Sequence, residues 1–258
     1  MSELLLSTNG LTKQYGHHKA VDKVNLHIKK GAIYGFIGRN GAGKTTCLKM
    51  ISGLARPTAG EIEMFGCKGK ELERIRSRVG CLIEAPGLYG NMNAYTNLKI
   101  KCELFGIRKK GYIEDILETV GLEGVGKKKT KHFSLGMKQR LGIGLALVGE
   151  PDLLVLDEPI NGLDPQGIAE VRDTIQRLRD ERNMTILISS HILEELSKIA
   201  TDYGIIHNGS LLQELTSEEL MKRCSERIEI ELIHPEQAVP ILDRMGFTNY
   251  QVTDKLSL

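Results

Sequence analysis

The chain has 258 residues, of which 41% are hydrophobic and 26% charged, and its formal net charge is +2. This apolar share supports one substantial α/β core and excludes a disordered chain, and the near-neutral charge gives no indication of a nucleic-acid groove. The five cysteines lack C-x-x-C spacing and no apolar run approaches the roughly 20 residues of a membrane span, so we expect reduced thiols, no zinc site and a membrane role only through another chain.

The N-terminal segments are predicted to form strands at residues 3–7, 21–28 and 32–37. Residues 11–16, between the first two, are predicted to form a turn that carries Tyr15. An aromatic ring at this place is either ordinary packing or, upstream of a phosphate-binding loop, a flat face on which a purine ring stacks. We adopt the second interpretation, which makes Tyr15 a nucleotide contact.

Residues 38–45 read Gly-Arg-Asn-Gly-Ala-Gly-Lys-Thr and fit the phosphate-loop pattern G-x-x-x-x-G-K-[ST]. They follow an apolar run of strand length and precede a predicted helix at 46–51, which is the context that the pattern needs. Glycines let backbone N–H groups turn toward a phosphate, Lys44 supplies a charge for the β and γ phosphates, and the Thr45 hydroxyl is placed to ligate Mg²⁺. The predicted contacts with a nucleoside triphosphate are Gly38, Arg39, Asn40, Gly41, Ala42, Gly43, Lys44, Thr45 and Thr46.

The next segments are predicted strands at residues 61–65 and 79–83, with a short polar helix at 72–77 between them. Residues 84–92, which begin with Glu84, fit no regular element. A lone carboxylate at a strand end beside Leu, Tyr and Met side chains indicates either an ordinary packed loop or a functional segment.

Residues 94–149 are helical in pattern and contain no convincing strand, so they are predicted to be a helical insertion in the α/β core. The basic run at 127–131 is interpreted as a solvated face. The insertion ends in a helix that is predicted to be capped by Ser134 and to run through Leu147.

Two acids follow the apolar run at residues 153–156, which is typical of a buried parallel strand. Ligands of open α/β sheets bind at the carboxyl ends of the strands, where Asp157 and Glu158 are expected to lie. Asp157 can reach Mg²⁺ through water, and Glu158 can take a proton from an attacking water. The next predicted strand, at 184–188, brings His191 to the same edge.

The C-terminal segments begin with a predicted hairpin at residues 201–212 around Asn208-Gly209. A helix is predicted at residues 216–223, with Thr216 and Glu219 as its capping box. A strand at 228–232, a helix at 238–245 and a last strand are predicted to form a small appendage. The sequence leaves open whether this appendage is complete.

In this order, the motifs resemble those of the ATP-binding subunit of an ABC transporter, over about residues 4–220. Residues 38–45 look like its Walker A loop, 153–158 like its Walker B strand with the catalytic glutamate, and 134–139 like its signature. The family's D-loop, switch histidine and adenine-stacking aromatic are matched by residues 161–164, His191 and Tyr15.

Two departures from the family pattern are informative. Leu135 replaces the first of two consecutive glycines in the signature, whereas Ser134 and Gly136, the phosphate contacts, remain. Glu84 stands where most members of the family carry glutamine. These forms of the loop and of the signature look like those of the branch that protects its own cell against lantibiotics or bacitracin.

The resemblance implies an α/β fold with a P-loop NTPase core, in which a RecA-like mixed sheet has helices on both faces. It further implies an N-terminal antiparallel β subdomain, an inserted α-helical subdomain at about residues 89–149 and a small C-terminal α+β appendage. We assign residues 1–224 to the ATP-binding domain and residues 225–258 to a β-α-β extension.

The resemblance also implies that ATP lies between two chains arranged head to tail, as a homodimer or with a paired ATPase subunit. Ser134 and Gly136 of one chain would contact the ATP held by the other, and Asp164 would reach the opposite site. The ligands of Mg²⁺ would be Thr45, Glu84 and Asp157, and the catalytic residues would be Glu158, His191 and Lys44.

The resemblance implies a separate transmembrane permease, which is expected to contact the loop from Glu84 to Met92. The chain is therefore expected to lie in the cytoplasm at the inner face of the membrane. No nucleic-acid partner is expected. The implied function is ATP hydrolysis coupled to the export of antimicrobial peptides or drugs. The alternatives are a soluble ABC-type ATPase that acts on nucleic acid or ribosomes, and an ATP-gated scaffold without hydrolysis.

Overall fold

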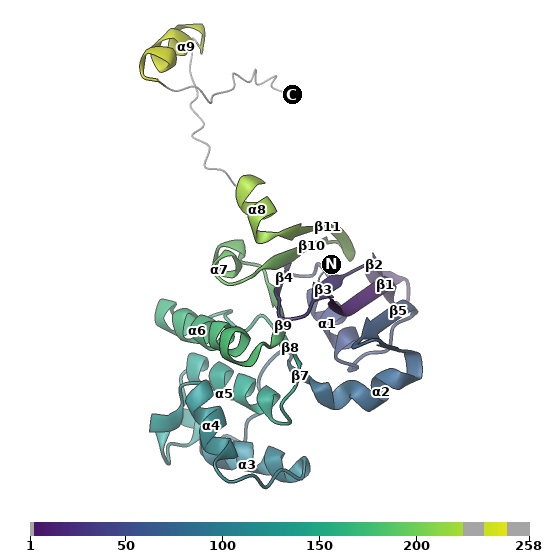
Figure 1. The fold of residues 1–258 in the computed structure, drawn as a ribbon, viewed down its shortest axis with the longest axis vertical. Helices are drawn as coiled ribbons and strands as arrows, with labels where there is room; N and C mark the ends of the chain where they lie inside the picture. Colours follow the sequence, from purple (N-terminus) through teal and green to yellow (C-terminus); the bar gives the residue numbers. More distant parts are fainter. Residues whose placement is uncertain (1–2, 224–234, 247–258) are drawn as a thin grey trace. The chain divides into compact units, whose positions relative to one another are not determined.

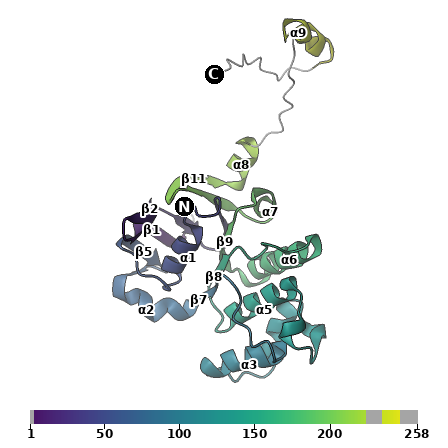
Figure 2. The same cartoon turned by 180° about the vertical axis from the view of Figure 1, so that it is seen from behind.

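The structure, a computed structural model, describes residues 3–223 and 235–246. Its contacts separate a larger unit, Met1–Leu220, from a smaller one, Met221–Leu258. The larger unit contains two sheets and their helices, which Figures 1 and 2 show from opposite sides. Neither described stretch contains a helix that is long and apolar enough to cross a membrane. The assignment of residues 1–224 and 225–258 to two domains stays a prediction.

The strands are β1 (Leu4–Tyr15), β2 (His18–Val24), β3 (His27–Lys29), β4 (Ile33–Ile37), β5 (Ala59–Met64), β6 (Cys67–Lys68), β7 (Val79–Leu82), β8 (Leu153–Asp157), β9 (Thr185–Ser190), β10 (Asp202–His207) and β11 (Ser210–Thr216). The α-helices are α1 (Lys44–Ile51), α2 (Leu72–Ile75), α3 (Ala94–Leu104), α4 (Tyr112–Thr119), α5 (Leu135–Leu147), α6 (Pro165–Arg182), α7 (Leu193–Ser197), α8 (Ser217–Arg223) and α9 (Pro235–Arg244). Short 3-10 turns are η1 (Gly69–Glu71), η2 (Arg76–Arg78), η3 (Glu123–Val125) and η4 (Thr130–His132).

The N-terminal antiparallel sheet has the order β2-β1-β5-β6, and β3 also pairs with β1. The predicted turn at residues 11–16 is wrong, because β1 continues to Tyr15 and pairs with β2 on one edge and β5 on the other. Leu11 lies opposite Val24 and is fully buried, so strand pairing and burial outweigh the local turn signal. The predicted strand at 21–28 is divided into β2 and β3, because its two ends pair with different parts of β1.

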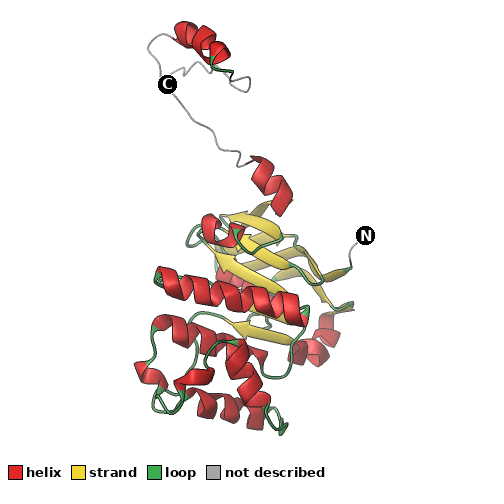
Figure 3. Ribbon diagram, turned by 60° about the vertical axis from the view of Figure 1, so that its left-hand side comes forward, coloured by secondary structure: helices red, strands yellow, loops and turns green. Residues whose placement is uncertain are grey.

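The second sheet has the order β11-β10-β4-β9-β8-β7. Its strands run parallel to their neighbours except β11, which is antiparallel to β10, so the predicted mixed sheet is confirmed. Alternate residues of β8 enter different cores: Leu154 and Leu156 pack with α5 and α6, whereas Leu153 and Val155 pack with α1 and the N-terminal sheet. Helices therefore cover both faces, and Figure 3 shows the long helix α6 against the strands.

The predicted helical insertion is confirmed, since α3, α4 and α5 lie between residues 94 and 149 and the structure describes no strand there. Each of these helices contributes a buried residue, Leu98, Ile116 and Leu141, to one apolar core. The predicted cap also forms: the Ser134 hydroxyl accepts a hydrogen bond of 3.2 Å from a backbone N–H of the first turn of α5.

The hairpin and the capping box predicted near the C-terminal end of the larger unit are both present. The hairpin of β10 and β11 turns at Asn208 and Gly209, whose φ angles are 46° and 79°. In the capping box, the N–H of Thr216 donates to Glu219 Oε2 at 2.8 Å, and the N–H of Glu219 donates to Thr216 Oγ1 at 3.3 Å. In the smaller unit, the predicted helix at 238–245 corresponds to α9, and the strands predicted on either side of it lie outside the described residues.

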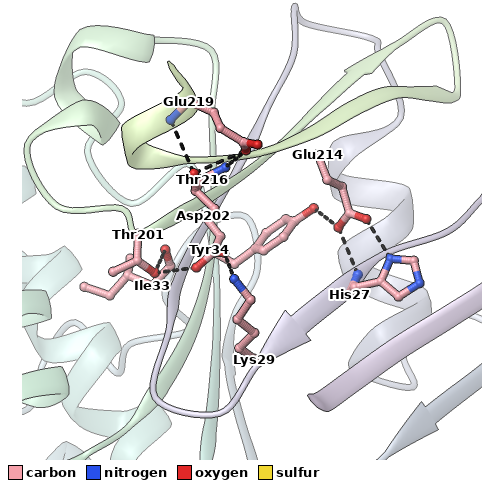
Figure 4. Close-up of polar contacts among 9 residues, drawn as sticks. All are labelled: His27, Lys29, Ile33, Tyr34, Thr201, Asp202, Glu214, Thr216 and Glu219. Atoms are coloured by element: carbon pink, nitrogen blue, oxygen red, sulfur yellow. Dashed lines mark hydrogen bonds and ion pairs between the residues drawn. The ribbon is translucent and has the colours of Figure 1, made fainter. Parts of the chain in front are cut away.

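A polar contact at Glu214 of β11 joins the two sheets (Figure 4). The Tyr34 hydroxyl of β4 donates to Glu214 Oε1 at 2.6 Å, and the backbone N–H of His27 in β3 donates to the same oxygen at 2.9 Å. His27 Nδ1 lies 2.7 Å from the other carboxylate oxygen. Tyr34 is 1% exposed, and burial raises the pKa of its hydroxyl far above the usual range, so it remains a hydrogen-bond donor.

Glu214→Ala is expected to lower the free energy of unfolding by about 1–3 kcal/mol, because it leaves the buried Tyr34 hydroxyl without this acceptor. Glu214→Gln is the control, since its amide oxygen can still accept the hydrogen bond, and a smaller loss is expected. Urea unfolding followed by circular dichroism measures both variants. Equal free energies for the two would contradict the role given to the Tyr34 hydrogen bond.

Candidate functional site

The phosphate loop, residues 38–45, connects β4 to α1 and has a shape that requires glycine. Gly43 has a φ of 105°, and a Cβ there would clash with the carbonyl oxygen of Ala20 in β2. The N–H of Gly209 in the β10–β11 turn donates to the carbonyl of Ala42 at 2.9 Å, and this hydrogen bond fixes the phosphate loop to the turn. α1 has no side-chain cap and no acid in its first turn, so its first N–H groups suit an anion.

Lys44 is buried at the start of α1, with 5% of its surface exposed. Its Nζ donates to the carbonyl of Gly38 at 2.6 Å and lies 3.0 Å from Glu158 Oε1. The loop lysine and the acid after β8, which two separate motifs predict, are therefore in direct contact. An ammonium group at this depth is screened little by water, so it can act strongly on a phosphate in the loop.

Asp157, at the end of β8, is buried and accepts two hydrogen bonds from hydroxyl groups. Thr45 Oγ1 donates to its Oδ2 at 2.7 Å, and Ser189 Oγ of β9 donates to its Oδ1 at 2.6 Å. Ser189 is a residue that the sequence motifs do not single out. The oxygen atoms of Thr45 and Asp157 fit Mg²⁺, which binds to few protein groups and otherwise to substrate phosphates and water. The described residues include no cluster of three or more His, Cys, Asp and Glu suited to a metal ion, so this smaller set is the candidate.

Each carboxylate oxygen of Glu158 lies close to a nitrogen atom of another side chain. Oε1 faces Lys44, and Oε2 lies 2.8 Å from Nδ1 of His191, the residue that follows β9. The backbone of Glu158 is in the left-handed region, with a φ of 47°, and its N–H donates to Ser189 Oγ at 2.9 Å. A non-glycine residue in this conformation is typical of functional sites. The structure thus brings together the predicted catalytic residues Lys44, Glu158 and His191.

Glu84 does not contact the Thr45–Asp157 pair. It follows β7 with a φ of 64°, its side chain is 65% exposed, and its Oε1 lies 2.5 Å from Nζ of Lys49 in α1. This hydrogen bond raises the pKa of the Lys49 ammonium group. Lys49 is a second residue that the sequence motifs miss, although its position four residues after Thr45 places both on one face of α1.

Four further predicted nucleotide contacts, Tyr15, Arg39, Asn40 and Thr46, are exposed or partly exposed. Tyr15, at the end of β1, is 53% exposed, and Lys13 Nζ lies 5.1 Å from the centre of its ring. Arg39 and Asn40 are exposed, and Thr46 is half-buried in the first turn of α1. These positions are open to a bound molecule.

The three residues predicted to act on the opposite site form a separate group. Ser134 is exposed at the start of α5. Gly136 is buried, and a Cβ atom added to it would lie 3.4 Å from the Cα of Gly167 in α6. Asp164 caps α6 by accepting a hydrogen bond of 3.0 Å from the N–H of Gly167. The hydrogen bonds of Ser134 and Asp164 are local, and none of them connects to residues 38–45 of the same chain.

A cavity of about 410 Å³ lies between the loop after β7 and α3, and we name it the α3 groove. Four of the residues that line it are large, apolar and exposed: Leu54, Tyr89, Leu104 and Phe105, at 63%, 55%, 79% and 50%. Lys101 also lines the groove, and burial lowers the pKa of its ammonium group. Apolar exposure of this kind is typical of a surface that contacts another protein.

Residues 21–161 match the family described as "ABC transporter". The bacitracin transport ATP-binding protein BcrA of Bacillus licheniformis is 49% identical over 93% of this chain and 79% of its own length. The lantibiotic transport ATP-binding protein SrtF of Streptococcus pyogenes is 44% identical over 81% of this chain and 90% of its own length. A solved dimeric ATP-binding cassette with bound ADP and phosphate superposes with a TM-score of 0.72 and 24% identity, over 82% of this chain and 98% of that one.

Proposed function

Since the chain belongs to the ABC transporter family of ATP-binding proteins, we propose that it is the ATP-hydrolysing subunit of an exporter of antimicrobial peptides or drugs. One observation carries the site assignment: Glu158 contacts both Lys44 and His191, which come from three separate motifs. The transported class is taken from the relatives, whose names state bacitracin and lantibiotic transport.

The proposed substrate is ATP, with its phosphates in the loop of residues 38–45. Lys44 balances charge on the β and γ phosphates, and the exposed ring of Tyr15 stacks on the adenine. Thr45, Asp157 and Glu84 are the proposed ligands of Mg²⁺, which neutralises charge on phosphate oxygens when it is bound. Ser189 acts through Asp157, because its hydrogen bond fixes the carboxylate that faces Thr45.

Glu158 acts on the attacking water. As the water oxygen bonds to the γ-phosphorus and the bond to the bridging oxygen breaks, the carboxylate accepts the proton of the water. His191 holds Oε2 of this carboxylate, so it orients the base. Phosphate competes with Oε1 for the ammonium group of Lys44, which leaves Oε1 to the water.

A second chain completes the site in this proposal. Ser134 at the start of α5 is exposed, and the helix start carries partial positive charge that favours a γ-phosphate. Because the hydrogen bonds of Ser134 and Asp164 do not reach the loop of their own chain, they are free to serve the loop of a second copy or of a paired ATPase subunit. ABC cassettes form dimers, as the solved dimeric cassette illustrates.

The α3 groove and the adjoining residues 84–92 are the proposed contact with a transmembrane permease. The groove offers exposed apolar side chains from α3 and from the loop, which match an apolar helix of a partner. This contact would place the chain in the cytoplasm at the inner face of the membrane. ATP-driven movement of the loop would then reach the permease directly.

Leu104→Glu is expected to abolish protection against bacitracin or lantibiotics in cells, because a charge in the groove opposes the apolar contact, while the purified variant hydrolyses ATP at the wild-type rate. The test restores a strain that lacks this chain with the wild type or the variant and compares the lethal concentrations. Leu212→Glu is the control, since Leu212 is similarly exposed, at 64%, and lies on β11 outside the groove. Full protection by Leu104→Glu would contradict the permease contact, and unchanged sensitivity of the deleted strain would contradict the transported class.

A further inference from the structure

The ion pair between Lys49 and Glu84 lies beside the residues that the reaction uses. Lys49 Nζ is 2.5 Å from Glu84 Oε1, and the two side chains are 33% and 65% exposed. The pair connects α1, which begins in the phosphate loop, to the loop after β7, whose residues Ala85, Pro86 and Gly87 line the α3 groove.

The position of Lys49 on α1 places this pair close to the proposed metal ligands. Residues four apart on an α-helix are neighbours on one face, about one turn or 5–6 Å apart. Lys49 is four residues after Thr45, whose hydroxyl is bonded to Asp157. Lys49, which holds the Glu84 carboxylate, therefore lies on the same face of α1 as Thr45, and the charge of Asp157 also contributes to the raised pKa of the Lys49 ammonium group.

We propose that Lys49 is a positioning residue that competes with Mg²⁺ for the Glu84 carboxylate. This inference rests on the proposed function, because it needs a Mg²⁺–ATP site at Thr45 and Asp157. When Glu84 turns from Lys49 to the metal, the adjoining residues 85–87 move with it. Lys49 thus sets the Mg²⁺ concentration at which Glu84 binds the metal and residues 85–87, at the edge of the α3 groove, move.

The exposure of the pair suits a contact that opens in each cycle. Solvent-exposed ion pairs change equilibria by only about 1.4- to 5-fold, so Mg²⁺ with bound ATP can displace Lys49. Glutamine at position 84 would form no ion pair with Lys49. The competition is therefore a property of glutamate at this position.

The test measures the Mg²⁺ concentration that gives half-maximal binding of a fluorescent ATP analogue to the purified full chain. The background is Glu158→Gln, which prevents turnover. Lys49→Met is expected to lower this concentration about two- to fivefold, because Glu84 is then free for the metal. In a chain that also carries Glu84→Gln, Lys49→Met is expected to change this Mg²⁺ concentration by less than about 1.4-fold, which is the smallest effect expected of an exposed ion pair.

Two control variants separate competition from other effects. Lys49→Arg keeps the ion pair and is expected to leave the Mg²⁺ concentration unchanged. Lys198→Met removes a lysine of similar exposure, 40%, that pairs with Glu195 at 2.7 Å in α7, and is also expected to leave it unchanged.

If Lys49→Met shifted the Mg²⁺ concentration equally in the chain with Glu84 and in the chain with Glu84→Gln, the shift would be a general effect of charge. That result would overturn the inference. No shift in the chain with Glu84 would overturn it as well. The failure of the proposed function gives a different result: the unsubstituted chain would bind no ATP analogue at any Mg²⁺ concentration.

Discussion

Glu158→Gln is expected to reduce ATP hydrolysis by about 100- to 10,000-fold, the usual contribution of a general base, and to leave ATP binding intact. Glutamine has nearly the shape of glutamate but cannot take the proton of the attacking water. The groups proposed to bind the phosphates, the loop of residues 38–45 with Lys44, are unchanged. Phosphate release measures hydrolysis, and equilibrium binding of a fluorescent ATP analogue measures affinity.

Glu150→Gln is a matched control for this variant. Glu150 also has a left-handed backbone, with a φ of 53°, but it is exposed after α5 and outside the site. Its substitution is expected to leave hydrolysis unchanged. Hydrolysis by Glu158→Gln at the wild-type rate would remove Glu158 from its role as the base, and loss of ATP binding would assign it a structural role.

Ser134→Asp is expected to reduce ATP hydrolysis by at least roughly 100-fold, because like charges brought together at an interface cost several kcal/mol. Aspartate caps helices as well as serine does, so α5 is expected to keep its start. Its carboxylate would, however, face the γ-phosphate that the second chain holds. Ser134→Asn provides a neutral cap and is expected to lose much less activity.

Mixing two inactive variants tests whether Ser134 acts on the opposite chain. Lys44→Ala lacks the loop lysine, and Ser134→Asp lacks a usable signature. A mixed pair contains one site that combines the intact loop of one chain with the intact signature of the other. Hydrolysis is expected to return on mixing, and two variants that stay inactive together would contradict the head-to-tail arrangement.

The sequence predicts that Lys44, Glu158 and His191 lie together, and the structure shows these contacts, because the signals are local. The phosphate-loop pattern fixes Lys44 and Thr45, and apolar runs followed by polar residues fix the ends of β8 and β9. Parallel strands end at a common edge of the sheet, so the contact of Glu158 with His191 follows from the order of the elements.

The residues that sequence reasoning misses depend on pairing between distant segments. Ser189 reaches Asp157 because these two residues are opposite each other in the β8–β9 ladder, and apolar composition does not fix that register. The pairing of Glu84 with Lys49 joins the loop after β7 to α1, and no sequence motif indicates it. The turn predicted at residues 11–16 is wrong for a related reason, since pairing of β1 on both edges outweighs a local turn signal.

The most direct test of the two-chain site is the molar mass of the Glu158→Gln protein in solution, measured by light scattering with Mg²⁺ and either ATP or ADP. We predict twice the mass of a single chain with ATP and the mass of one chain with ADP, because in the proposed site only the γ-phosphate reaches Ser134 of the second chain. Adding Ser134→Asp to Glu158→Gln is predicted to give a single chain with both nucleotides. A Glu158→Gln protein that binds ATP and yet keeps the mass of one chain would contradict a site shared between two chains.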